Sequence, residues 1–306
     1  MEHRNERYNF PENIERITAG QGAESLIIYG KSKTILLDTG MPYCYKRLID
    51  NIWNSLKTRG REKIDYILLS HSHYDHTGAV PYLINAWPEV QIVAAAKCKK
   101  VFESETARSV MKRLGESARD SYGNEEEKKE EILVSPLRVD IVLGDGDKFV
   151  TDLDSGEYFA VLETKGHTDC SLTFVFEPQS IMFASESTGV MSSPVRIETA
   201  ILKSYKETIE AALKCKEYGA KKIVSPHYGM VADSVANTYF DLYIKMAEQE
   251  RDLVLRLYEE NKTFEKTLEA YTDYYWGDGR AQTQPKAAFL ENATPIVKTI
   301  IREFTE

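Results

Sequence analysis

Positions 71–76 constrain the fold and chemistry of this chain more than any other part of its sequence. They read His-Ser-His-Tyr-Asp-His, and only Ser70 separates them from the apolar run 64–69, which is typical of a buried strand. If the chain stays extended through His71 and His73, both rings lie on one side of it, because side chains alternate along a strand. A helix that begins near Asp75 then presents Asp75 and His76 to a neighbouring position. One segment could therefore ligate two divalent metal ions about 3.5–4 Å apart, and we expect a strand to end at a metal site.

Two further histidines follow predicted strands. His167 lies in Gly-His-Thr after the apolar run 157–164, and His227 lies in Pro-His-Tyr after the run 222–225. The sixth histidine, His3, lies in the polar N-terminal segment. Neutral imidazole is the commonest nitrogen ligand of zinc and iron. Five histidines at strand ends therefore indicate a shared metal site and not a scatter of core or surface residues.

Apolar runs alternate with amphipathic segments along the first part of the chain. The pattern predicts a hairpin at 25–30 and 33–38, a helix at 43–58, a strand at 64–69, a helix at 77–86 and a strand at 90–95. Strands that alternate with helices are typical of a layered α/β fold. More strands are expected between 138 and 186, followed by a helix at 204–217 whose capping box is Ser204 and Glu207.

The composition limits the classes of partner. The 306 residues carry a formal net charge of −9, and an acidic surface repels phosphate backbones and anionic lipid. We therefore expect a small-molecule substrate and neither a nucleic-acid nor a membrane partner; a homodimer stays open. Four cysteines without a C-x-x-C pair, no apolar leader and no membrane-length apolar run favour a cytoplasmic protein with free thiols.

We predict a catalytic domain at 1–232 and a C-terminal helical subdomain at 233–306. Residues 97–133 are expected to be a helical insertion, which ends in the charge run 125–131. Such a run is typical of a solvated face or mobile insertion, and the alternative is a lid beside the site. The tail is expected to begin with one long helix through Val235 and Leu257 and to be divided again at Pro295.

The order of these motifs resembles the metallo-β-lactamase superfamily over residues 17–232. The resemblance rests on Asp38 at the end of the first hairpin, the segment 71–76, His167, Glu186 in Phe-Ala-Ser-Glu-Ser, and His227. It implies a four-layer αββα sandwich with the site at one edge of two packed sheets. The helical tail resembles in layout that of glyoxalase II and the quinolone-signal-type thioesterases.

The resemblance also implies roles for these residues. One metal would be held by His71, His73 and His167, and the other by Asp75, His76 and His227. Glu186 would bridge the two metals, and Asp38 would orient the 71–76 loop through hydrogen bonds.

The chain departs from the family pattern at two positions. Glu186 stands where the family usually has Asp, so its carboxylate must sit further back or bind one metal alone. Asp169 and Cys170 stand where many members have Pro-Gly. Cys170 is expected to be either a buried thiol, a soft ligand or a redox group.

The implied reaction is hydrolysis of a small ester, thioester, lactone or phosphoester by a metal-bound hydroxide. Two divalent ions are expected, zinc first, with iron or manganese as alternatives. Asp75 would take up the proton, and Tyr228 would donate to the oxyanion or merely pack beside the site, as would Tyr74. An iron-dependent oxidoreductase is the alternative function, and a regulatory protein with vestigial catalysis is a third.

The substrate pocket is less constrained. Its candidate walls are the insertion 97–133, the segment 191–199 and the helical tail. The tail carries an aromatic group that could line a pocket or form core: Tyr271, Tyr274, Tyr275 and Trp276. Arg196 and Arg280 are candidates to bind a substrate carboxylate.

Overall fold

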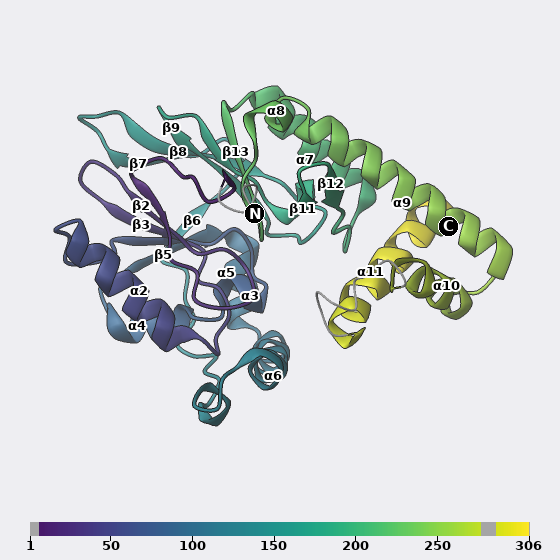
Figure 1. Ribbon diagram of the computed structural model, residues 1–306, viewed down its shortest axis with the longest axis horizontal. Coiled ribbons are helices and arrows are strands. Elements are labelled where there is room, and N and C mark those ends of the chain that lie inside the picture. The colour runs from purple at the N-terminus through teal and green to yellow at the C-terminus, as the bar shows by residue number, and fades with distance from the viewer. Residues whose placement is uncertain (1–5, 277–285, 306) are drawn as a thin grey trace.

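The computed structural model describes residues 6–276 and 286–305, which form two six-stranded sheets and a two-stranded hairpin. His3 and Arg280 lie outside the described residues. Figure 1 shows strands in the middle of the molecule, with α2 (Tyr45–Thr58) and α4 (Val80–Ala86) on one side and α7 (Tyr205–Tyr218) and α9 (Tyr239–Asn261) on the other. The expected αββα layering with a helical extension is confirmed.

The first sheet contains the four strands predicted from apolar runs between residues 25 and 95. Its first three strands pair antiparallel with one another and the others pair parallel. Helical crossovers therefore place β4 beside β3 and β5 beside β4. All four residues of β3 are buried, as expected for a strand covered on both faces. In spatial order the strands are β1 (Ile14–Arg16), β2 (Leu26–Tyr29), β3 (Thr34–Leu37), β4 (Tyr66–Leu68), β5 (Gln91–Ala95) and β6 (Ile141–Leu143).

The second sheet is largely antiparallel, with one parallel pair between β10 and β13. The main apolar core includes Ile35, Phe159 and Phe174 of the two sheets and continues to residues of α2 and α4. A second apolar cluster lies between the sheet's other face and helices α7 and α9. In spatial order the strands are β14 (Gly229–Met230), β13 (Lys222–Ser225), β10 (Ile181–Phe183), β9 (Leu172–Glu177), β8 (Glu157–Glu163) and β7 (Lys148–Asp152).

The insertion consists of α5 (Ala96–Glu103), α6 (Glu105–Tyr122) and the 3-10 turn η1 (Glu127–Lys129). The charge run is not a fully solvated face. Glu127 is buried and accepts a hydrogen bond from Arg47 Nε at 2.8 Å, and Lys46 Nζ lies 2.6 Å from Glu130 Oε1. Both partners lie on α2, so these acidic residues fasten the insertion to the sandwich.

Two expectations about the helical tail are wrong. The first helix is interrupted, because α8 (Asp233–Ala236) ends before α9 begins, and α11 (Lys286–Thr305) runs through Pro295 without a break. Proline removes the hydrogen bond to the carbonyl of Glu291, but Glu291 is exposed, so water can satisfy that carbonyl. α10 (Phe264–Trp276) completes the tail.

Helix α9 contributes residues to two apolar clusters. Tyr239, Tyr243 and Ala247 pack into the cluster on the second sheet, whereas Val254 packs with residues of α10 and α11. The proposed division at 232/233 stays a prediction.

A buried carboxyl in α9 makes a pH-dependent contribution to stability. Glu250 is 5% exposed and accepts a hydrogen bond from Tyr271 Oη at 2.5 Å. Burial raises the pKa of Glu250 to about 7. The folded state therefore holds this proton more tightly than the unfolded chain. Its stabilising contribution is complete below about pH 4.3 and is lost as the pH rises to about 7, a change of roughly 3 kcal/mol.

We therefore expect Glu250→Gln to flatten the pH profile of stability. Relative to the parent chain, the variant should gain free energy of unfolding between pH 5 and pH 8, because it has no carboxyl to ionise. Urea unfolding of both metal-free proteins, followed by circular dichroism, measures the difference. Glu259→Gln, at an exposed position of the same helix, is the control. Parallel profiles for Glu250→Gln and the parent would contradict the expectation.

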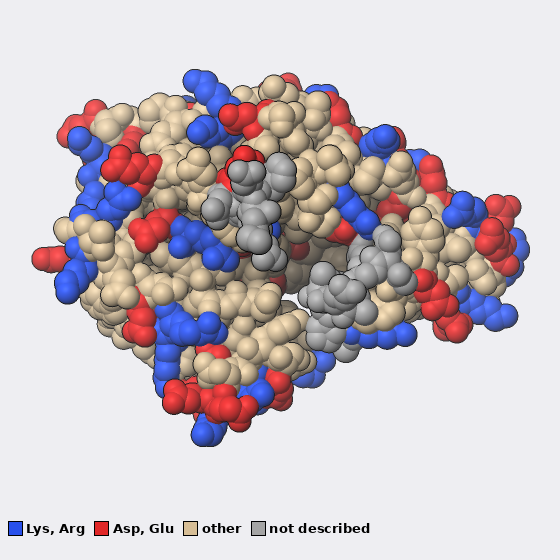
Figure 2. Space-filling view, viewed as in Figure 1, with Lys and Arg blue, Asp and Glu red and all other residues tan. Residues whose placement is uncertain are grey.

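No described helix is long and apolar enough to cross a bilayer. Figure 2 shows acidic and basic side chains intermixed over one face of the molecule.

Candidate metal centre

Seven ligand-type side chains meet at one edge of the sandwich, although they come from four separate parts of the chain. His71 and His73 follow β4, and α3 (Tyr74–Thr77) carries the next two. The other three follow or connect strands of the second sheet. They fall into two groups whose donor atoms lie within 4.8 Å of one another: His71, His73 and His167; and Asp75, His76, Glu186 and His227.

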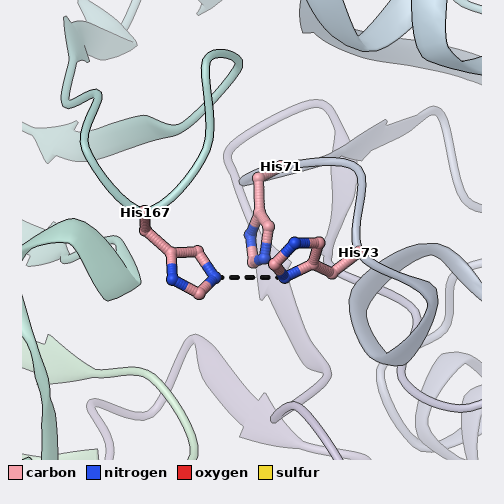
Figure 3. A group of neighbouring side chains, drawn as sticks. All are labelled: His71, His73 and His167. Carbon is pink, nitrogen blue, oxygen red and sulfur yellow. Dashed lines mark hydrogen bonds between the residues drawn. The ribbon is translucent and has the colours of Figure 1, made fainter. Parts of the chain in front are cut away.

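In the first group the three imidazoles point toward one another (Figure 3). His167 Nε2 lies 3.1 Å from His73 Nδ1. His71 Nε2 is buried and has no hydrogen-bond partner among the described residues. A buried nitrogen without a partner is costly, and a metal ion is a partner that such a nitrogen can take.

In the second group the carboxylate oxygens lie close to the imidazole nitrogens. His76 Nε2 lies 2.6 Å from Glu186 Oε1 and 3.3 Å from His227 Nε2. Asp75 Oδ2 lies 3.7 Å from His76 Nε2 and 3.6 Å from His227 Nε2. Two carboxylates and two imidazoles form a donor set suited to zinc, iron or manganese.

Glu186 faces both groups. Its Oε1 lies 3.0 Å from His227 Nε2, and its Oε2 lies 3.3 Å from His167 Nε2. Glu186 is the first residue of the 3-10 turn η2 (Glu186–Thr188), which Ala184 and Ser185 separate from β10, and it is 9% exposed. One carboxylate thus reaches donors of both groups.

Four of the imidazoles are held by the nitrogen that points away from the centre. This arrangement fixes the tautomer and leaves Nε2 free to bind. The Nδ1 contacts are His71 with Ser70 Oγ at 3.1 Å, His76 with Asp38 Oδ2 at 2.8 Å, His167 with Ala200 O at 2.9 Å, and His227 with Gly22 O at 3.1 Å. The carbonyls of Ala200 and Gly22 carry no signal in the sequence, because any residue could supply them.

Asp38 makes the orienting contacts expected of it. Its Oδ1 accepts from Ser70 N at 2.8 Å, and its Oδ2 accepts from Ser70 Oγ at 2.7 Å and from His76. Asp38 adopts a φ of 51°, a left-handed conformation that Asp tolerates better than most residues. The carboxylate therefore ties the end of β3 to the 71–76 loop.

Gly166 shapes the loop that presents His167. Its φ is +117°, and a Cβ there would lie 2.3 Å from Thr208 Cγ2 and 2.6 Å from Thr208 N. No residue other than glycine fits this turn against the start of α7.

The two groups differ in electrostatics. Burial lowers the pKa of His71 well below its usual value and the pKa of His73 to about 4, so both rings are neutral and able to ligate. Burial opposes charge on His76, but the Asp75 and Asp38 carboxylates raise its pKa well above the usual value. Burial would raise the pKa of Glu186, yet the neighbouring imidazoles His167 and His227 lower it well below its usual range. The carboxylates at the second group thus stabilise positive charge on its imidazoles, and they would stabilise a bound cation in the same way.

Tyr228 and Tyr74 each pack against an apolar cluster. Tyr228 packs in the cluster on the outer face of the second sheet, and Arg7 lies 5.4 Å from its ring centroid. Tyr74 is partly buried against the main core. The catalytic roles of Tyr228 and of Asp75 stay predictions.

Cys170 is a buried thiol that neither ligand group includes in the described part of the chain. Its Sγ donates to Ser72 Oγ at 3.3 Å. A hydrogen bond with Cys98 lowers the pKa of Cys170 to about 6, helped by Ser72 and Thr168 and opposed by burial. Because Cys170 is buried and lies outside both ligand groups of the described residues, the buried-thiol alternative fits better than the soft-ligand one.

The candidate pocket walls are regular structure. All of segment 191–199 except Thr199 lies in the hairpin of β11 (Val190–Ser193) and β12 (Arg196–Glu198). Tyr271 is core of the tail, Tyr275 and Trp276 pack against that core, and Tyr274 is 59% exposed.

Comparison with known proteins gives the family. A model described as "Metallo-beta-lactamase superfamily" matches residues 19–227. A metallo-beta-lactamase fold-containing protein of Sulfurisphaera tokodaii is 23% identical over 232 residues, which is 72% of this chain and 78% of that protein. An atrochrysone carboxyl ACP thioesterase of Claviceps purpurea is 25% identical over 168 residues, which is 55% of this chain and 40% of that one.

A solved structure agrees with the fold. The metallo-beta-lactamase family protein of Thermus thermophilus superposes with a TM-score of 0.67 at 15% identity, covering 96% of this chain and 94% of that one. Coverage of this extent includes the helical extension as well as the sandwich. With a family model matching more than half of its length, the chain belongs to the metallo-beta-lactamase superfamily.

Proposed function

We propose that the protein is a hydrolase that holds two divalent metal ions and cleaves a small ester, thioester, lactone or phosphoester. The observation that carries the proposal is the position of Glu186, whose two oxygens face donors of both ligand groups. A carboxylate shared in this way suits a pair of metals better than a single one. Most members of the superfamily are hydrolases, and the thioesterase relative favours an acyl substrate.

The fit of the residues supports this function. One ion would be held by His71, His73 and His167, and the other by Asp75, His76, Glu186 and His227. When bound, a divalent pair lowers the pKa of coordinated water toward neutrality and polarises the substrate oxygen. Asp75 belongs to the second group and is partly exposed, so it could take up a proton at the site and return it to solvent.

We expect freshly purified, metal-supplemented protein to contain about two metal ions per chain, because two complete donor groups are present. Elemental analysis by ICP-MS gives the number and the element. Less than half an equivalent would remove the basis of the proposal. A panel of esters, thioesters, lactones and phosphodiesters then identifies the substrate class, and a metal-loaded protein inert toward all four would contradict hydrolysis.

An iron-dependent oxidoreductase is the second candidate. The observation that favours it is the pair of carboxylates, Asp75 and Glu186, in the second group, because iron accepts carboxylate and imidazole ligands together. Purification without oxygen, followed by elemental analysis, separates the two functions. Iron in place of zinc or manganese, with oxygen consumption and no hydrolysis, would support the oxidoreductase.

A further inference from the structure

The segment 199–204, between β12 and α7, contacts the loop that carries His167. The carbonyl of Ala200 accepts the Nδ1 hydrogen of His167 at 2.9 Å. The carbonyl of Gly166, the residue before His167, accepts from Lys203 N at 2.8 Å and from Ser204 N at 3.1 Å. The segment therefore fixes both the backbone and the ring of one candidate metal ligand.

The opposite side of this segment is held by the helical tail. Glu250 of α9 accepts a hydrogen bond from the hydroxyl of Thr199. Thr299 Oγ1 of α11 donates to Leu202 O at 3.0 Å, and Arg302 Nη2 donates to Lys203 O at 2.7 Å. The tail thus forms hydrogen bonds with three residues of the segment, and the first of them, Thr199, is the neighbour of Ala200.

Glu250 is built into this contact and is not a surface residue with an incidental partner. It is 5% exposed, and its two oxygens are shared between two elements. Oε1 accepts from Tyr271 of α10 at 2.5 Å, while Oε2 accepts from Thr199. A carboxyl buried between α9, α10 and the segment can hold Thr199 in one place, because each oxygen has a fixed donor.

We propose that Glu250 and Thr199 are positioning residues for the metal centre, acting through the Ala200 carbonyl on the ring of His167. The proposal deepens the proposed function and rests on its assignment of His167 as a metal ligand. The helical tail is then part of the apparatus that orients a ligand, in addition to any role as a wall of the substrate pocket.

The size of the effect follows from the geometry. A partner that holds the outer nitrogen of a ligating histidine fixes its tautomer and ring angle, and loss of such a partner typically costs 10–100-fold in metal affinity. Loss of the Thr199 hydroxyl frees the backbone next to Ala200 without removing the carbonyl itself. We expect about a 10-fold faster release of the metal bound by His167, with release of the other metal unchanged.

The experiment compares Thr199→Val, which removes the hydroxyl at nearly constant volume, with Thr199→Ser, which keeps it. Metal transfer from the loaded protein to a chromophoric chelator is followed in time, and His167→Ala identifies which kinetic phase belongs to the His167 group. We expect Thr199→Val to accelerate that phase alone and Thr199→Ser to resemble the parent. Substitution with cobalt gives an independent readout. The visible spectrum of the cobalt protein should differ from the parent's in Thr199→Val and match the parent's in Thr199→Ser.

Glu259→Gln, exposed on the same helix as Glu250, is the control and should leave both phases unchanged. Glu250→Gln is the second variant if Thr199→Val does not fold, and it should accelerate the same phase. Equal acceleration of both phases, or none, would overturn the positioning role while the two-metal centre stands. A parent protein that binds no metal would overturn the proposed function as well, so the two failures are distinguishable.

Discussion

Replacing His73 by Ala should lower hydrolytic activity by at least about 100-fold and leave the fold intact. The imidazole is one of three donors in the first group, and removal of a ligand should cost at least as much as removal of a supporting partner. His73 precedes the short helix α3 and is not part of the main apolar core of the described residues, so little of the core depends on it. Elemental analysis should show the loss of about one metal per chain, and circular dichroism should be unchanged.

Tyr74→Phe is the matched control for this prediction, because it changes the neighbouring side chain and leaves all seven donors in place. It should retain about two metals per chain. A collapsed spectrum for His73→Ala would show that the ring supports the fold, and full activity would show that the first group does not take part in catalysis.

Local patterns explain which parts of the fold and site were predictable. The segment 71–76 carries its ligands within six positions, so strand and helix geometry alone place them in two groups. The strands β2 to β5 were predictable because each is a short apolar run between turns. The break after α8 was not predictable, because Asn237 and Thr238 interrupt the helix and neither residue is a proline or a glycine.

Contacts between distant parts of the chain could not be predicted from the sequence. The charge run 125–131 resembles a solvated face until the fold brings Arg47 and Lys46 of α2 against it. The same holds for Glu250, which looks like one of many acidic residues on a long helix. Its burial depends on Thr199 and Tyr271, which lie far from it in the sequence.

Glu186 stands at a position where the family usually has the shorter Asp. A longer stem could have left the carboxylate on one metal alone, but here Oε1 lies near His76 and His227, and Oε2 lies 3.3 Å from His167 Nε2. The buried backbone after β10 therefore sits at a distance from the donors that suits the extra methylene. This geometry predicts different outcomes for two conservative changes at the position.

Glu186→Gln should weaken metal binding at the group shared with His227 by about 100-fold or more, because it removes the negative charge and turns an N–H donor toward imidazole nitrogens. Glu186→Asp should be milder but not neutral, because it keeps the charge and withdraws it from one or both groups. Competition with a chelator, together with turnover of the best substrate, ranks the two variants against the parent. If Glu186→Gln retained metal and activity at the parent's level, Glu186 would not be a ligand, and the second group would have to be completed by Asp75, His76 and His227 alone.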